Sequence, residues 1–204
     1  MIRTDFQTNE IRLWNNFRKG DVKAYDQIFQ LYAKKLYNYG LKLTKHADLI
    51  EDSIQELFID LWEKRSKVNE TDSIEYYLYK SLRRRIIRLI QTHSQIVFSD
   101  LYPAGEENYF DLEIDTEAIL NSELHHFNID LLVEAINALS PKQKEIIYLR
   151  YYSNLSFEEI SEVMLLSKKA SYNLMFKTIN TLRKIMQNSK VPFSSLLILN
   201  YIIP

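Results

Sequence analysis

The sequence predicts an all-α protein made of two small helical domains joined by an acidic linker. Glycine and proline are scarce, with 3 and 4 in 204 residues, and no stretch alternates apolar and polar residues as a half-buried strand does. Apolar residues instead recur every three or four positions along several segments, which is the period of an amphipathic helix. Residues 93–126 break this pattern and divide the chain into two helical parts.

Composition and charge narrow the class of protein. Cysteine is absent, which excludes disulfides, thiolate metal sites and cysteine nucleophiles and is typical of a reducing compartment. The first residues form no apolar signal region, and no apolar run reaches about 18 residues, so we expect a cytoplasmic protein without direct membrane insertion. The net charge is only −1, but residues 64–88 are basic whereas residues 89–141 contain no Lys or Arg. This asymmetry indicates a polyanionic partner for one part of the chain and a basic environment for another.

The first domain is expected to span residues 1–92 and to begin with two helices. Thr8 is predicted to cap a short helix that runs to about Arg18, and Gly20 is predicted to end it. Asp21 is predicted to cap the second helix. The apolar positions of that helix are most simply interpreted as core, and they are Tyr25, Ile28, Phe29, Tyr32, Leu36, Tyr39 and Leu43.

The third helix, residues 49–62, carries the most informative pattern of the first domain. Its large apolar residues form one wide stripe, which consists of Ile50, Ile54, Leu57, Phe58, Leu61 and Trp62. The opposite side carries a polar and acidic set, which consists of Glu51, Asp52, Gln55, Glu56 and Asp60. Like charges four residues apart repel by roughly 0.2–0.5 kcal/mol per pair. This face is therefore either the solvated side of a core helix or a surface that meets a basic partner.

A polar loop, residues 66–72, precedes a fourth helix that is capped by Thr71, Asp72 or Ser73 and extends to about Gln91. Its core stripe is predicted to be Ile74, Leu78, Leu82, Ile86 and Leu89. The other faces interleave aromatic rings with cations, and the candidate nucleic-acid-binding residues are Tyr76, Tyr77, Lys80, Arg83, Arg84 and Arg88. Unpaired bases stack on rings while Lys and Arg follow the phosphates. The alternative is an ordinary basic helix with tyrosines at its rim.

After the acidic linker, residues 127–190 are expected to form the second domain and residues 191–204 an apolar tail that packs on it. Residues 131–139 are predicted to be helical. Ser140-Pro141 followed by Gln143 predicts the start of a helix that runs to about Tyr152. Ser156 followed by Glu159 predicts a second capping box, which opens a short helix to about Met164.

A three-residue turn, 165–167, then leads to a last helix from Lys168 to Met186. Its predicted apolar set is Leu174, Met175, Ile179, Leu182 and Met186. A short helix, a tight turn and a longer helix with basic residues have the layout of a helix-turn-helix, in which the N-terminal half of the second helix enters the DNA major groove.

Together these motifs resemble the extracytoplasmic-function (group 4) sigma factors of bacterial RNA polymerase. Residues 50–62, Ile-Glu-Asp-Ser-Ile-Gln-Glu-Leu-Phe-Ile-Asp-Leu-Trp, are similar to the region 2.2 helix, whose usual form is Ala-Glu-Asp-x-x-Gln-x-x-Phe-x-x-x-Trp. Residues 29–32, Phe-Gln-Leu-Tyr, with Leu36-Tyr37 are similar to the start of region 2. Residues 139–143, Leu-Ser-Pro-Lys-Gln, with 148–151, Tyr-Leu-Arg-Tyr, and 156–160, Ser-Phe-Glu-Glu-Ile, are similar to region 4.

The resemblance, which covers roughly residues 21–91 and 131–184, implies a sigma factor that directs core RNA polymerase to promoters, without a cofactor, a metal or enzymatic chemistry of its own. It implies that the β′ clamp helices of the polymerase bind Glu51, Asp52, Gln55, Glu56 and Asp60. It implies that the segment from the loop 66–72 through Arg88 helps to melt the promoter −10 element and holds flipped bases. An anti-sigma factor is a further expected partner.

For the second domain, the resemblance implies that the helix-turn-helix reads the −35 duplex and contacts the β flap. The implied −35 residues are Lys168, Lys169, Tyr172, Asn173 and Lys177. Asn can pair with adenine, and Lys can pair with guanine or phosphate. The acidic linker would pass toward the RNA exit path.

The chain also departs from the family pattern. Arg84 and Arg88 stand where region 2.4 commonly has Asn and Asp, and the turn glycine expected near Leu165 is missing, which allows an altered turn geometry. Ala170-Ser171 replaces the Thr-Val pair that usually opens the recognition helix. The usual basic residues beyond that pair are replaced by Tyr172, Leu174 and Ile179.

These departures keep a second function open, namely a sigma-like interaction module that binds polymerase or an anti-sigma factor without reading a promoter. The arginines at 83–88 favour promoter recognition over this alternative. A metal-dependent enzyme that uses Asp52, Glu56 and Asp60 is disfavoured, because one helix face cannot surround an ion.

Overall fold

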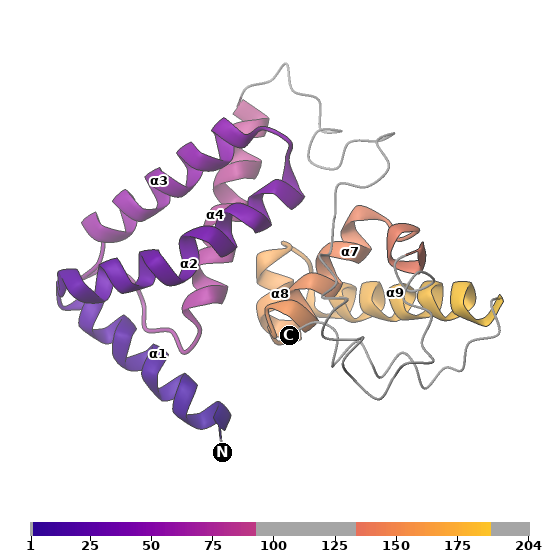
Figure 1. The fold of residues 1–204 in the computed structure, drawn as a ribbon, viewed down its shortest axis with the longest axis horizontal. Coiled ribbons are helices and arrows are strands. Elements are labelled where there is room, and N and C mark those ends of the chain that lie inside the picture. Colours follow the sequence, from indigo (N-terminus) through magenta and orange to yellow (C-terminus); the bar gives the residue numbers. More distant parts are fainter. Residues whose placement is uncertain (1, 93–133, 189–204) are drawn as a thin grey trace. The chain divides into compact units, whose positions relative to one another are not determined.

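The computed structural model describes residues 2–92 and 134–188, which belong to two compact units (Figure 1). The N-terminal unit contains α1 (Ile2–Arg18), α2 (Val22–Leu43), α3 (Ala47–Glu63) and α4 (Ile74–Thr92). The C-terminal unit contains α7 (Pro141–Ile147), the π-helical turn η2 (Tyr148–Tyr152), α8 (Phe157–Val163) and α9 (Lys168–Asn188). Within the described ranges every regular element is helical, which confirms the all-α class with two helical domains. The predicted linker, 93–126, and the predicted tail, 191–204, lie outside the described residues.

The N-terminal helix begins earlier than predicted. α1 starts at Ile2, so Thr8 lies inside the helix and does not cap it. No Gly or Pro interrupts residues 2–18, and threonine lowers helix stability only modestly, so the helix continues through it. The predicted end is confirmed at Gly20, whose φ of 91° is in the left-handed region. The predicted cap of α2 is also confirmed, because Asp21 Oδ1 accepts hydrogen bonds from the backbone N–H groups of Lys23 at 2.9 Å and Ala24 at 3.3 Å.

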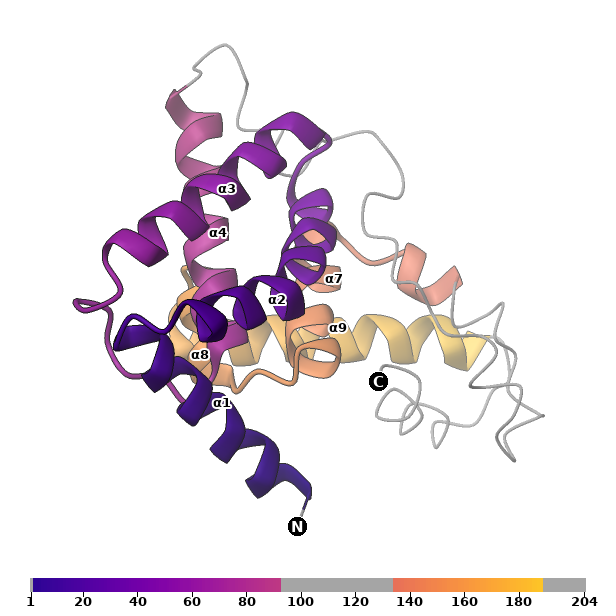
Figure 2. The same cartoon turned by 60° about the vertical axis from the view of Figure 1, so that its left-hand side comes forward.

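Helices α2, α3 and α4 contact one another pairwise and enclose the core of the N-terminal unit (Figures 1 and 2). The buried residues at core positions are Ile28, Tyr32, Leu36, Tyr39 and Leu43 of α2, Ile50, Ile54, Leu57, Phe58 and Leu61 of α3, and Ile74, Leu78, Leu82, Ile86 and Ile90 of α4. The apolar face predicted for each of these three helices is therefore the face that is buried. α2 and α3 lie close together at Gly40, where a Cβ atom would lie 2.5 Å from the Ile50 side chain.

Four predicted core positions of this unit are less buried than expected. Phe29 of α2 is 45 % exposed, and Tyr25 and Trp62 are half-buried. Leu89 is half-buried because the four-residue steps along α4 continue from Ile86 to Ile90, and Ile90 takes the buried place. Ser73 is the residue that caps α4, since its Oγ accepts a hydrogen bond from the Tyr76 N–H at 3.2 Å.

In the C-terminal unit, α7 and α8 both pack against α9. The first capping box is confirmed, because the Ser140 N–H donates to Gln143 Oε1 at 2.9 Å. The second is confirmed as well, since the Ser156 N–H donates to Glu159 Oε2 at 2.7 Å and the Glu159 N–H donates to Ser156 Oγ at 3.2 Å. Of the predicted helix at 131–139, residues 134–137 are helical and residues 131–133 lie outside the described part.

The buried face of α9 is more polar than predicted, and it consists of Ser171, Met175, Thr178 and Leu182. The Ser171 and Thr178 hydroxyl groups donate to the backbone oxygens of Lys168 and Leu174, both at 2.8 Å, so their burial leaves no unpaired hydroxyl. Leu174 and Ile179, two members of the predicted apolar set, are only half-buried, and the Met186 side chain lies outside the described part. None of the helices in the described ranges has the length and apolar character that a membrane-spanning helix needs.

Candidate functional sites

The acidic ridge of α3, which we define as Glu51, Asp52, Gln55, Glu56 and Asp60, lies opposite the core stripe of this helix. Asp60 is half-buried, and the other four residues are exposed. The apolar residues of α3 fill the space against α2 and α4, and the helical period then places the polar residues on the outer side. The five predicted residues therefore share one accessible face.

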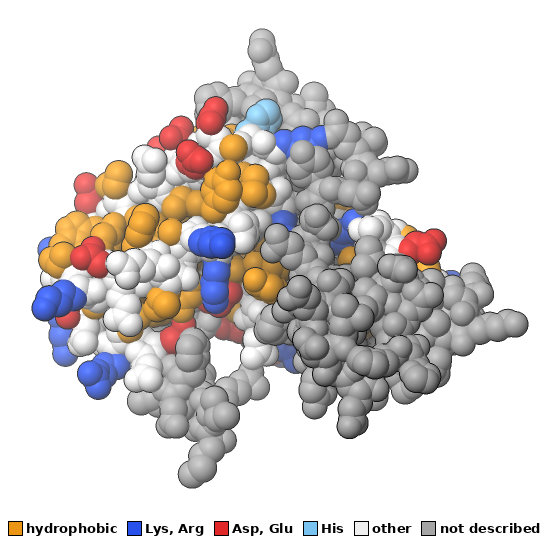
Figure 3. All heavy atoms as spheres, viewed as in Figure 1, with side chains coloured by type: hydrophobic (Ala, Val, Ile, Leu, Met, Phe, Trp, Pro, Cys, Tyr) orange, Lys and Arg blue, Asp and Glu red, His pale blue; other side chains and the backbone are white. Residues whose placement is uncertain are grey.

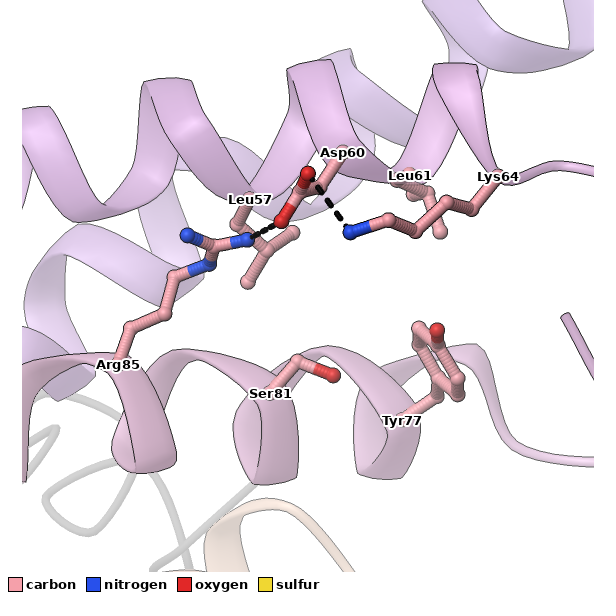
Figure 4. A pocket seen from close by; sticks show the side chains of 7 residues that line it. All are labelled: Leu57, Asp60, Leu61, Lys64, Tyr77, Ser81 and Arg85. Atoms are coloured by element: carbon pink, nitrogen blue, oxygen red, sulfur yellow. Dashed lines mark hydrogen bonds and ion pairs between the residues drawn. The ribbon is translucent and has the colours of Figure 1, made fainter. Parts of the chain in front are cut away.

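The C-terminal half of the acidic ridge is paired within the unit, and these ion pairs offset part of the repulsion between its acids. Arg85 of α4 donates to Glu56 Oε2 at 3.0 Å and also to Asp60 Oδ2 (Figure 4). Lys64 Nζ donates to Asp60 Oδ1 at 2.9 Å. The hydrogen bonds from Lys64 and then Arg85 hold the pKa of Asp60 below its usual value. Glu51 and Asp52 form no ion pair with any residue in the described part of the chain.

Arg85 also borders a pocket of about 150 Å³ between α3 and α4. In Figure 4, Arg85 and Lys64 reach Asp60 from two sides, and Ser81 and Tyr77 of α4 lie opposite. Because Arg85 binds two of the three carboxylates that the metal-enzyme alternative requires, this face is not arranged as a metal site. Sequence reasoning missed Arg85, since Asp60 is 25 positions away and no local pattern relates the two residues.

The basic face of α4 keeps five of its six predicted residues accessible. Arg84 and Arg88 are exposed, whereas Tyr76, Tyr77 and Lys80 are half-buried. Lys80 Nζ donates to the Tyr76 hydroxyl oxygen at 2.9 Å and lies 5.2 Å from the centre of the Tyr76 ring. The Tyr77 ring packs against Trp14 of α1, with ring centres 5.0 Å apart.

Arg83, the sixth predicted residue, is only 5 % exposed. It follows the fully buried Tyr79 by four residues, and the two residues therefore lie on the same inner side of α4. The Tyr79 ring stacks on Tyr39 of α2 with ring centres 4.6 Å apart, so this side of α4 belongs to the core. Arg83 is consequently not part of the accessible basic face.

Helix α1 holds the loop 66–72 that leads into this basic face. Trp14 Nε1 donates to the Asn69 carbonyl oxygen at 2.9 Å. Arg18 Nε donates to the Val68 carbonyl oxygen at 3.1 Å, and Arg18 Nη1 pairs with Glu70 at 3.0 Å. These partners are at least 50 positions apart in the sequence, and no sequence pattern indicated them.

All five predicted −35 residues are exposed on α9: Lys168, Lys169, Tyr172, Asn173 and Lys177. The helix is capped by Ser167, whose Oγ accepts a hydrogen bond from the Ala170 N–H at 3.1 Å. Lys168 forms an ion pair with Glu158 of α8, and their hydrogen bond raises the pKa of Lys168 and lowers that of Glu158.

Tyr172 is positioned by a neighbouring aromatic ring. Its ring stacks on Phe157 of α8 with centres 4.2 Å apart, and the Arg150 guanidinium lies 5.3 Å from the centre of the Phe157 ring. Sequence reasoning missed Phe176, which is 68 % exposed on the same side of α9. The sequence pattern that could have indicated it is an aromatic residue that does not share the helical spacing of the buried positions Met175 and Thr178.

The turn between α8 and α9 has the backbone geometry that a glycine would favour, although a leucine occupies it. Leu165 has a φ of 56°, and the Leu166 N–H donates to the Ser161 carbonyl oxygen at 2.8 Å, as in a Schellman motif. The missing glycine has therefore not removed the left-handed turn. A residue with a Cβ atom pays about 1–2 kcal/mol for this conformation.

Family models match both units. The model of Sigma-70 region 2 matches residues 28–96, and the model of Sigma-70, region 4 matches residues 129–182. The ECF RNA polymerase sigma factor SigM of Bacillus subtilis (strain 168) is 23% identical over 155 residues, which are 74% of this chain and 88% of SigM. SigW of the same organism is 25% identical over 154 residues, 72% of this chain and 80% of SigW. SigK of Mycobacterium ulcerans (strain Agy99) is 19% identical over 152 residues, 74% of this chain and 79% of SigK.

Two solved structures share the fold. CnrH, in complex with the cytosolic domain of CnrY, superposes with a TM-score of 0.51 at 13% identity and covers 87% of this chain and 97% of its own. The sigma factor RpoE, in complex with the anti-sigma factor NepR from Bartonella quintana, gives a TM-score of 0.52 at 18% identity, with 81% and 98% covered.

A basic helix with aromatic side chains in one unit and a helix-turn-helix in the other, each within a matched sigma region, define a transcription initiation factor of the sigma-70 class. The chain belongs to the extracytoplasmic-function sigma factors of that family, and the resemblance stated from the sequence is confirmed.

Proposed function

We propose that this chain acts in the cytoplasm as the promoter-specificity subunit of bacterial RNA polymerase. The N-terminal unit docks on the core enzyme and opens the −10 element, and the C-terminal unit binds the −35 duplex and the β flap. The observation that carries this proposal is the presence of both sigma regions in one chain, in this order, each with an exposed basic surface. The chain supplies binding and positioning, and the polymerase supplies all covalent chemistry.

The acidic ridge is the proposed docking surface for the β′ clamp helices. Its N-terminal part is exposed and carries Glu51 and Asp52 without a competing ion pair from the described residues, so a basic partner meets uncompensated charge there. Asp52→Ala combined with Gln55→Ala is expected to lower the affinity for core polymerase while leaving the fold intact. An unchanged affinity would reject this assignment.

The basic face of α4 is the proposed −10 surface. Arg84 and Arg88 are exposed and suit phosphate contacts, and the half-buried rings of Tyr76 and Tyr77 are the proposed stacking partners of unpaired bases on the sides that Lys80 and Trp14 leave open. Arg84→Ala combined with Arg88→Ala is expected to abolish open-complex formation but to preserve core binding. Promoter melting by this variant at the wild-type rate would show that the DNA surface lies elsewhere.

The exposed side of α9 is the proposed −35 surface. Lys169 and Lys177 suit guanine or phosphate, and Asn173 suits adenine, because the amide group matches the adenine edge in the major groove. Lys168 must exchange its ion pair with Glu158 before it contacts DNA. Asn173→Ala is expected to relax base preference at one −35 position, whereas Lys177→Ala is expected to weaken binding to all sequences and to reduce its salt dependence.

Run-off transcription tests the function as a whole. Purified core polymerase is supplied with a fragmented genomic library, with and without the full chain, and an active sigma factor serves as the positive control. New start sites that depend on the chain and share upstream sequences are expected. Core binding without any new transcript would favour the second candidate, an interaction module that does not read promoters. If the chain does not bind core polymerase and produces no new transcript, both candidate functions are rejected.

An anti-sigma partner is also proposed, since the CnrH and RpoE structures are both complexes with a bound partner. Apolar side chains gather over α2 and α3 on the face shown in Figure 3. The exposed Val22 of α2 and Ile59 of α3 line one shallow pocket together with Tyr25 and Trp62. A regulator that covers this surface next to the acidic ridge would block core docking. Competition between core polymerase and the purified regulator for the chain tests this inhibition.

A further inference from the structure

Phe176 is the most exposed large apolar side chain among the described residues, with 68 % of its surface accessible. It makes no ring contact with another described residue. This contrasts with Tyr172 one turn earlier, whose ring is held against Phe157 at 4.2 Å. Phe176 therefore contributes little to the packing of the C-terminal unit.

The position of Phe176 on α9 places it among the proposed −35 residues. Asn173 precedes it by three positions and Lys169 by seven, which are the spacings of neighbours on one helix face. The buried positions Met175 and Thr178 lie on the other side of the helix. An apolar ring is thus surrounded by the Lys and Asn side chains that would contact phosphates and base edges.

The major groove offers one apolar group to such a ring. Thymine presents its C5-methyl group there, and the other base edges present hydrogen-bond donors and acceptors. Lys and Asn side chains satisfy those donors and acceptors, but they gain little from a methyl group. The ring of Phe176 does gain, because contact with the methyl group removes apolar surface from water on both sides.

We propose that Phe176 is a specificity-determining residue that contacts the thymine methyl group at one position of the −35 element. The proposal rests on the proposed −35 recognition by α9 and goes beyond it, since it assigns a base to a residue that departs from the polar pattern of this helix. A −35 element bound by this chain then contains a thymine that is read by its methyl group.

The test uses the full chain bound to core polymerase and a promoter duplex library with a randomised −35 segment. Bound duplexes are sequenced for the wild type and for Phe176→Ala, Phe176→Leu and Leu165→Ala. The Leu165 variant is the matched control, because it removes an exposed apolar side chain from the turn of the same unit. In the preferred duplex, each −35 thymine is then replaced by uracil, which removes the methyl group and keeps every hydrogen-bonding group.

One thymine position is expected to be enriched by the wild type, Phe176→Leu and Leu165→Ala but not by Phe176→Ala. Uracil at that position should weaken wild-type binding about four-fold, the effect of one buried methyl group, and should leave Phe176→Ala binding unchanged. Equal binding of thymine and uracil duplexes by the wild type would overturn the assignment of Phe176 alone. If Phe176→Ala binds core polymerase more weakly but keeps the thymine preference, the ring contacts protein, and the assignment to thymine is overturned as well. If the wild type selects no −35 sequence, the proposed −35 function fails together with this inference.

Discussion

Arg85 of α4 forms an ion pair with Asp60 of α3 and simultaneously binds Glu56 one turn earlier (Figure 4). This pair divides the acidic ridge into two parts with different roles. Glu56 and Asp60 form ion pairs that connect α3 to α4, whereas Glu51 and Asp52 are exposed, have no ion pair among the described residues and belong to the proposed docking surface. Substitutions along one helix face are therefore expected to separate stability from docking.

Replacing Asp60 with Asn is expected to lower the free energy of unfolding of the full chain by about 0.2–1 kcal/mol at pH 7, the usual range for an exposed ion pair. The folded state lowers the pKa of Asp60 below its ordinary 3.8, so the stabilisation is present above that value and is lost as the pH falls through the folded pKa. Urea unfolding of both proteins between pH 7 and pH 3 measures the difference. Asp52→Asn is the matched control and should leave stability unchanged, and an equal loss in the two variants would contradict the division of the ridge.

Glu10 of α1 should produce the opposite pH dependence. It accepts a hydrogen bond from Tyr32, but its burial raises the pKa above 4.5, and repulsion by Glu75 adds to this despite the nearby Lys35. The stabilising contribution is complete below pH 4.5 and is lost as the pH rises through the folded pKa, because the buried carboxylate must then ionise.

Glu10→Gln keeps an acceptor for Tyr32 and removes the titration. Its free energy of unfolding should exceed that of the wild type by an amount that grows as the pH rises from 4.5 and then levels off. Denaturant unfolding across pH 4 to 8 measures this difference, with the exposed Glu51→Gln as control. A difference that is constant with pH would show that Glu10 does not titrate with a raised pKa.

Gly40 allows α2 and α3 to approach, since an added Cβ atom would lie 2.5 Å from the Ile50 side chain. Gly40→Ala is expected to lower the free energy of unfolding by about 1–2 kcal/mol, because overpacking outweighs the gain in helix propensity. In an Ile50→Ala background the obstacle is gone, and adding Gly40→Ala should then be neutral or stabilising. Chemical unfolding of the wild type, the two single variants and the double variant gives the coupling free energy between residues 40 and 50. If the two substitutions have additive effects on the free energy of unfolding, the contact is contradicted.

Leu165→Gly should stabilise the C-terminal unit by about 0.5–1 kcal/mol, because the relief of left-handed strain exceeds the extra chain entropy of glycine. The control is Asn154→Gly at φ 53°, where asparagine already tolerates this backbone and little change is expected. Thermal unfolding of the full chain measures both. Destabilisation by Leu165→Gly would mean that the leucine side chain contributes packing that its 56 % exposure does not suggest.

Features with short-range signals could be predicted from the sequence. The cap at Asp21 and the capping boxes at Ser140 and Ser156 involve partners within three residues, and each lies where expected. The core stripe of α3 could also be predicted, because its large apolar residues keep helical spacing for more than three turns.

Features that depend on distant partners could not be predicted. Arg83, Arg84 and Arg85 are chemically alike, yet one is buried, one is exposed and one binds the acids of α3. Only the rotation of α4 against its neighbours distinguishes them. The left-handed backbone conformation at Leu165 could not be predicted from the preference of leucine either. The surrounding helices impose this conformation on a residue that disfavours it.

The bonds from Trp14 and Arg18 to the backbone of residues 68 and 69 give the loop 66–72 a fixed course before any nucleic acid arrives. The conformational entropy of this loop is lost when the protein folds and not when a base is captured. A loop ordered only by DNA would give binding a large unfavourable entropy change, whereas a pre-organised loop gives a smaller one. α1, which precedes the segment that matches region 2, thereby lowers the entropic cost of the proposed binding of single-stranded DNA by that region.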